Sequence, residues 1–171
     1  LKDGGGCWIE GMPELNNHIL NYLTQLFSSE MQHTDPSILE KVQREVTEQM
    51  NNFLLAPFTA NDVREAVWSI GDVKAPVPDG LHMMFFKRYW HLIGEDITKE
   101  VLSAINSRKI PDEWNDTSIV LIPKSENPQL ITQYRPISLC NVLYKIASKV
   151  ISNRLKIVLP DIISEEQSAF V

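Results

Sequence analysis

The sequence predicts an α+β fold that is mostly helical and contains one small antiparallel β-hairpin. Two observations lead to this prediction. Apolar residues recur at steps of three and four over most of the chain, and two short β-branched runs, 117–123 and 135–140, interrupt that period. With 171 residues and an apolar content of 43%, the chain is long enough for one compact domain with an appendage.

The N-terminal third predicts a linker followed by two helices. The first dozen residues are glycine-rich and unpatterned, which is typical of a linker. Helical spacing begins at Glu14. Asp35 and Pro36 suit the start of a second helix, whose apolar stripe reaches Met50. We expect these two helices, acidic on the outside, to form a packing or spacer hairpin without chemistry of its own.

The middle of the chain predicts three further helices. Thr59, with Asp62 three residues later, resembles a capping box and opens a helix that Gly71 ends. The segment 81–94 carries aromatic residues at helical spacing, a pattern more typical of a core than of an aromatic binding platform. An amphipathic helix, 95–106, follows and stops near Pro111.

The last third predicts the hairpin and a long helix. The β-branched runs become strands joined by a long loop rich in Pro, Asn and Gln. A helix then extends from about 141 to 159, and Pro160 is expected to end it.

A helical wheel of this last helix separates its charges. Lys145, Lys149 and Lys156 fall on one side, as a solvated basic ridge opposite the apolar residues. Arg154 falls in the middle of the apolar face. We expect its charge to reach solvent or to pair with a carboxylate such as Asp161 or Glu165.

Charge is distributed unevenly along the chain, whose net charge is −6. Residues 1–56 hold three basic and eight acidic side chains, whereas 118–156 hold six basic residues and one acid. A local basic surface of this kind suits a phosphate-binding face. The sequence has neither a run of roughly 18 uncharged apolar residues nor a signal-peptide pattern, so we expect an intracellular chain that is neither secreted nor membrane-bound. Cys7 and Cys140 lack zinc-site spacing.

The candidate functional residues are cationic. The sequence contains no metal-ligand cluster, no nucleophile with an adjacent base and no glycine-rich phosphate cradle. Lys124 ends the first predicted strand and Arg135 begins the second, so both lie at the rim of one small sheet. A lysine point charge and an arginine fork suit a phosphate chain. Solvated charges at strand ends are the alternative.

Several segments, in order, resemble the reverse transcriptase of non-LTR retrotransposons, of the LINE type found in plant genomes. These are "LLAPFTANDVREAVWSIGDVKAPVPDGL", "FFKRYW", "TSIVLIPK", "YRPISLCNVLYKIASKVISNRLK" and "ISEEQSAFV". The resemblance implies that 1–56 is a linker and helical region preceding the polymerase. It implies that 57–171 is a partial reverse transcriptase domain, the fingers of a right-hand polymerase with a truncated palm. Nuclear or cytoplasmic location follows from the same resemblance.

The resemblance also assigns roles to residues. Lys124 and Arg135 correspond to the fingers residues that hold the triphosphate of the incoming nucleotide. Lys145 and Lys149 are candidates for contact with the nucleic-acid backbone. The "QSAFV" segment resembles the motif that lines the template and nucleotide pocket, which makes candidates of Gln167, Ala169 and Phe170.

The family's palm uses aspartates, among them an Asp-Asp pair, to hold two Mg²⁺ ions. The sequence contains no Asp-Asp dipeptide. We therefore expect Mg²⁺, an RNA template, a DNA primer and deoxynucleotides to be needed by the full-length enzyme, and these 171 residues alone to bind no Mg²⁺ and to be inactive. The alternatives are a helical interaction protein derived from such an element, with the acidic helices as its surface, or a non-catalytic nucleic-acid-binding module.

The connector "KAPVPDG" departs from the family pattern, which has glycine at the position of Val77. Valine before proline favours extended backbone, so we expect a negative φ and an intact turn. A positive φ would instead mean strain.

Overall fold

A computed structural model describes residues 1–28, 46–73 and 80–163. Within these ranges the chain is mostly helical with a two-stranded antiparallel hairpin, which confirms the α+β prediction. Backbone contacts divide it into two compact units. The described part of the first contains residues 1–28 and 119–138, and that of the second contains 46–73, 80–118 and 139–163. The predicted boundary at residue 56 stays a prediction, and Val77 lies outside the described residues.

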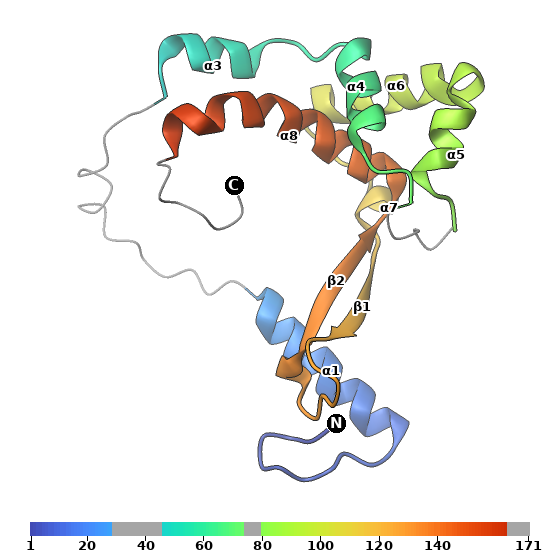
Figure 1. Ribbon diagram of the computed structural model, residues 1–171, viewed down its shortest axis with the longest axis vertical. Helices are drawn as coiled ribbons and strands as arrows, with labels where there is room; N and C mark the ends of the chain where they lie inside the picture. Colours follow the sequence, from blue (N-terminus) through green and yellow to red (C-terminus); the bar gives the residue numbers. More distant parts are fainter. Residues whose placement is uncertain (29–45, 74–79, 164–171) are drawn as a thin grey trace. The chain divides into compact units, whose positions relative to one another are not determined.

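The first unit contains helix α1 (Met12–Phe27) and most of the hairpin (Figure 1). Strands β1 (Thr117–Pro123) and β2 (Tyr134–Cys140) confirm the two predicted runs, and β2 begins one residue earlier than expected. A short 3₁₀ helix, Ile131–Gln133, immediately precedes β2. The N-terminal segment is bonded to the hairpin loop, because the Lys2 N–H donates to the Gln129 carbonyl over 2.7 Å.

The second unit is built around helices α4 (Ala60–Ser69), α6 (Trp90–Ser107) and α8 (Val142–Ile162), each of which contacts the other two (Figure 1). Its core consists mainly of apolar residues from these helices, and the largest side chains that are completely or almost completely buried are Val63, Val67, Val101, Ile146 and Val150. Beta-branched side chains fill this core because three helix faces at the expected spacing converge there.

The capping box predicted at the start of α4 is confirmed. The Thr59 N–H donates to Asp62 Oδ2 over 2.6 Å, and the Asp62 N–H donates to Thr59 Oγ1 over 3.4 Å. These two bonds satisfy donors that a helix start leaves without an intrahelical partner.

The prediction of a continuous helix that reaches Met50 is wrong for the residues that the structure describes. Thr47 is extended (φ −74°, ψ 162°) and caps a new helix, α3 (Glu48–Leu55), by accepting the Met50 N–H over 3.2 Å. A threonine hydroxyl offers the backbone this alternative to a continuous helix. The rest of the expected helix lies outside the described residues.

The predicted break between 94 and 95 is also misplaced. Helix α5 (Met83–Arg88) ends at Tyr89 (φ −101°, ψ 16°), and α6 then runs through Gly94 without interruption. A Cβ at this position would lie 2.6 Å from Cε2 of the Trp90 indole, so glycine is the residue that fits this turn of the helix. Phe86 and Trp90 pack against the core as expected, whereas Phe85 and Tyr89 are exposed.

A four-residue helix, α7 (Asp112–Asn115), joins α6 to β1 and buries Trp114. Helix α8 begins at the predicted place, where the Asn141 side chain accepts the Tyr144 N–H over 2.8 Å. Its predicted end is wrong, because Pro160 lies inside the helix, which continues to Ile162. A proline in the last turn removes only one intrahelical hydrogen bond, so the helix tolerates it there.

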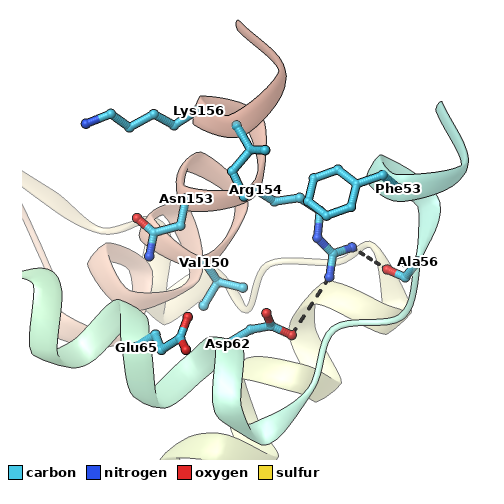
Figure 2. A pocket seen from close by; sticks show the side chains of 9 residues that line it. Phe53, Ala56, Asp62, Glu65, Val150, Asn153, Arg154 and Lys156 are labelled. Carbon is cyan, nitrogen blue, oxygen red and sulfur yellow. Dashed lines mark hydrogen bonds and ion pairs between the residues drawn. The ribbon is translucent and has the colours of Figure 1, made fainter. Parts of the chain in front are cut away.

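Arg154 lies on the apolar side of α8, where its charge is neutralised by contacts with the end of α3 and the segment that leads to α4 (Figure 2). Its guanidinium donates to the carbonyls of Leu54 and Pro57, each over 3.2 Å, and to that of Ala56. It also lies 3.4 Å above the Phe58 ring centroid.

The carboxylate near Arg154 is Asp62, whose Oδ2 is 3.8 Å from Nη2. The prediction of a carboxylate partner is therefore confirmed in kind, but Asp161, the one described member of the predicted pair, is not the partner. The Arg154 side chain is only 10% exposed, and backbone carbonyls supply most of its hydrogen bonds.

Candidate functional site

Lys124 follows β1 and is fixed by the loop that leads to β2. Its N–H donates to the Gln133 carbonyl over 2.8 Å, and its Nζ donates to the Thr132 carbonyl, also over 2.8 Å. The loop is itself held by Gln133, whose Oε1 accepts the N–H groups of Gln129 and Leu130 over 2.6 and 3.0 Å. Because an ammonium has three donors, Lys124 keeps two for a ligand.

The register of the hairpin places Arg135 on the same face as Lys124. Residue 124 is bonded to residue 133 at one end, and the Thr117 hydroxyl lies 3.7 Å from the Cys140 sulfur at the other. Both contacts fit one register, in which Arg135 faces Ile122. Side chains two residues apart on a strand share a face, so Lys124 and Arg135 are diagonal neighbours, a spacing of about 7–8 Å between their backbones.

The same register explains why two prolines are tolerated in the strands. Pro123 and Pro136 both fall in pairs that exchange no backbone hydrogen bonds, so their missing N–H groups leave the ladder intact. The hairpin can therefore keep a fixed register, and with it a fixed spacing of the two cations, despite a proline in each strand.

The face that carries Lys124 and Arg135 is open to solvent. Both cations are exposed, and the strand residues beside them, Val120, Ile122 and Ile137, are 43%, 45% and 37% exposed. Within the part of the chain that the structure describes, the Arg135 side chain forms no ion pair or hydrogen bond. An apolar floor with two cations at one end can hold a molecule that has both an apolar part and a phosphate chain.

The other predicted site residues are not brought to this face by any observed contact. Lys145 and Lys149 share one side of α8 in the second unit, and both are half-buried rather than fully solvated. The template-pocket candidates, Gln167, Ala169 and Phe170, lie outside the described residues. Their roles stay predictions.

A pocket of about 390 Å³ adjoins Arg154, between α8, α3 and α4 (Figure 2). Figure 2 shows Glu65 and Asn153 on its wall and the guanidinium turned toward Ala56 and Asp62. Because Arg154 is already engaged by three carbonyls and Asp62, it is a structural residue here and not an anion-binding one.

One pair outside the predicted site has the chemistry of a binding surface. The Arg64 guanidinium lies 5.3 Å from the Trp68 ring centroid, and Trp68 is 45% exposed. Neither residue was predicted as functional. The sequence feature that could have identified them is the spacing of a cation and a tryptophan four residues apart on one helix, because side chains at that spacing meet.

Among the described residues, no three His, Cys, Asp or Glu side chains come together as a possible metal site. None of the described helices combines the length and the apolar character needed to cross a membrane.

Comparison with known proteins gives one informative similarity. The chain is 33% identical over 123 residues to the "Transposon TX1 uncharacterized 149 kDa protein" of Xenopus laevis. The chain has a homologue among transposon proteins. The match covers 72% of this chain but only 9% of the Xenopus laevis protein, so the chain spans about a tenth of that relative's length. No family model matches the sequence.

Proposed function

We propose that this chain is the amino-terminal part of the reverse transcriptase of a non-LTR, LINE-type retrotransposon of plant-like sequence, and that it contains the linker, the fingers and the start of the palm. The hairpin binds the triphosphate of an incoming deoxynucleotide. The observation that carries the proposal is the placement of Lys124 and Arg135 on one open hairpin face. The similarity to a transposon protein supports the origin of the chain in such an element.

In this proposal the two cations bind the phosphates in different ways. Lys124, oriented by the Thr132 carbonyl, supplies a point charge, and Arg135 supplies a planar fork that bonds two phosphate oxygens at once. The exposed floor of Val120, Ile122 and Ile137 contacts the apolar part of the nucleotide or the template. In the full-length enzyme Mg²⁺ would neutralise charge on the reacting phosphates, and RNA template and DNA primer would be the partners.

Binding of a deoxynucleoside triphosphate to the 171-residue chain tests the proposal. The double variant Lys124→Ala/Arg135→Ala should weaken binding at least about tenfold, because hydrogen bonds to charged groups contribute about 1.5–3 kcal/mol each. The matched control, Arg88→Ala/Lys109→Ala, removes the same charge from exposed positions elsewhere. Equal affinities for the two double variants would contradict the proposal.

A second candidate is a nucleic-acid-binding module without catalysis, favoured by the shared side of Lys145 and Lys149 on α8. RNA binding should then depend steeply on salt, and Lys145→Ala/Lys149→Ala should reduce the slope by about 1.4, or about 0.7 for each cation on a single strand. A slope that the double variant leaves unchanged would exclude this role.

A further inference from the structure

A cleft of about 310 Å³ is formed in the second unit by the end of α6, by α7 and by the N-terminal half of α8. Both α6 and α7 pack against α8. The inner wall is apolar and is fixed by the core, because Trp114 belongs to the core and Ile105 and Ala147 pack against it. The volume is at the lower end of the range of about 300–1,000 Å³ that ligand sites occupy, so the cleft suits a small molecule.

Two isoleucines form an apolar part of the lining that is open to solvent. Ile110 is 49% exposed and Ile151 is 43% exposed. Isoleucine side chains have few rotamers, so they present a stiff surface. Contact with an apolar molecule would remove this surface from water, which is favourable in proportion to the area covered. A ligand of the cleft should therefore have an apolar part.

The polar groups of the lining are hydrogen-bond donors. They are the Arg108 guanidinium and the hydroxyls of Tyr144 and Ser148. Within the described part of the chain, none of these three groups forms a side-chain hydrogen bond or an ion pair. The lining of the cleft includes no aspartate or glutamate. A cation without a counter-charge suits an anion, and the guanidinium fork matches the two oxygens of a carboxylate.

The backbone of Arg108 gives an independent reason to assign a function to this residue. Its φ is 55° and its ψ is 25°, and it is the only residue other than glycine with a positive φ in the described ranges. It ends α6, where its N–H donates to the Ile105 carbonyl over 3.2 Å. Glycine is the usual residue at such a helix end, because a Cβ makes the left-handed conformation unfavourable. No observed side-chain contact offsets this cost, and residues in such conformations are concentrated at functional sites.

We propose that this cleft binds a small apolar carboxylate, such as a medium-chain fatty acid. The carboxylate binds Arg108, and the apolar chain covers Ile110 and Ile151. A phosphate would use the donors but would leave the isoleucines in water, whereas a purely apolar molecule would leave the guanidinium without a partner. All lining residues belong to the second unit, and the proposal does not rest on triphosphate binding by the hairpin.

The test is a titration of the 171-residue chain with octanoate, below its micelle concentration, followed through the backbone amides and the Trp114 indole resonance. Saturable shifts should be centred on residues 104–108 and 144–151. In contrast, 1-octanol has the same chain length without the charge and should bind at least about tenfold more weakly, the effect of losing one charge-assisted hydrogen bond. Equal affinities for the two molecules, or shifts spread over the whole chain, would overturn the proposal.

The variant Arg108→Gly separates binding from stability. It should weaken octanoate binding about tenfold, because the charge is lost. It should also raise the urea midpoint by about 0.3 M, because glycine accepts the positive φ without strain. The control Lys109→Ala removes an adjacent exposed cation that does not line the cleft, and it should leave octanoate binding unchanged. Unchanged octanoate affinity in Arg108→Gly, or a lower midpoint, would contradict the assignment.

A second variant keeps the test decisive if Arg108→Gly fails to fold. Ile151→Glu places a carboxylate in the lining at a position that is 43% exposed, so the helix should tolerate it. It should abolish octanoate binding by repulsion, and retained binding would refute the proposal.

Two further measurements distinguish other ligands. Co-sedimentation of the wild-type chain, but not of Arg108→Gly, with phosphatidylcholine and phosphatidylserine vesicles would assign the cleft to a membrane surface instead of a free carboxylate. Saturating octanoate should leave deoxynucleoside triphosphate binding unchanged. Competition between the two for the shifts at residues 104–108 would show that the cleft binds phosphates, and the proposal would be wrong. Triphosphate binding by the hairpin is measured at residues 124 and 135, so either proposal can fail without the other.

Discussion

Replacing Arg154 with alanine should destabilise the second unit strongly, because this side chain joins α8 to the α3–α4 connector. It donates to three backbone carbonyls, lies over the Phe58 ring and is 10% exposed. Hydrogen bonds to a charged group contribute about 1.5–3 kcal/mol each, but the connector carbonyls regain water once the arginine is gone. We expect a loss of about 3 kcal/mol, at the lower end of the range for breaking a buried charge interaction.

Urea unfolding of the full chain, followed by tryptophan fluorescence, measures this loss. With an m-value of about 2 kcal/mol/M, the midpoint should fall by about 1.5 M. Arg154→Lys should recover part of the loss, because an ammonium keeps the charge but cannot bond several carbonyls in one plane. Lys156→Ala, the exposed neighbour on α8, should change stability by less than about 0.5 kcal/mol.

The variant Asp62→Asn measures what the carboxylate contributes to stability, separately from the contribution of the backbone carbonyls. Because Asp62 lies 3.8 Å from the guanidinium and an asparagine oxygen can still accept the Thr59 N–H, we expect a loss below about 1 kcal/mol. A midpoint for Arg154→Ala within about 0.3 M of the wild-type value, or an Asp62→Asn loss as large as that of Arg154→Ala, would refute this reasoning.

Three other substitutions test the packing by the same urea midpoint. Thr59→Ala removes the capping hydroxyl and should cost about 1 kcal/mol; no change would mean that the capping box is not formed in solution. Gly94→Ala should destabilise by about 1–2 kcal/mol despite the better helix propensity of alanine, because the new methyl meets the Trp90 ring, and a gain in stability would contradict that contact. Ile146→Ala, at a completely buried position, should cost about 2–5 kcal/mol, and a smaller loss would place it outside the core.

Local patterns were enough to predict the parts of the fold that local interactions determine. The Thr59 and Asp62 capping box, the two strands and the start of α8 each depend on residues within a few positions of one another. The buried residues of α4, Val63, Ala66 and Val67, recur at helical spacing, which a local pattern is able to show.

Features that depend on distant residues were predicted less well. Arg154 could be recognised as misplaced on an apolar face, but its partners, about a hundred residues earlier in the chain, could not be identified from spacing. The continuous α6 was missed because the helical pattern was divided between residues 94 and 95, whereas Gly94 lies inside the helix and accommodates an indole four residues away. The prediction that Pro160 ends the helix was wrong for a similar reason, because the effect of a proline depends on how close it lies to the end of the helix.

The candidate site was likewise predictable only in part. The proximity of Lys124 and Arg135 at one end of the hairpin followed from strand order, but their common face required the register. The pair of Arg64 and Trp68 was not predicted, because only the packing shows that this tryptophan stays exposed.

The most direct test of the central claim is a titration of the chain with a deoxynucleoside triphosphate, followed through the backbone amide resonances. Binding at the hairpin should give saturable shifts centred on residues 124 and 135, much weaker shifts with the corresponding monophosphate, and loss of both in Lys124→Ala/Arg135→Ala. Shifts confined to other parts of the chain, or equal responses to triphosphate and monophosphate, would contradict it.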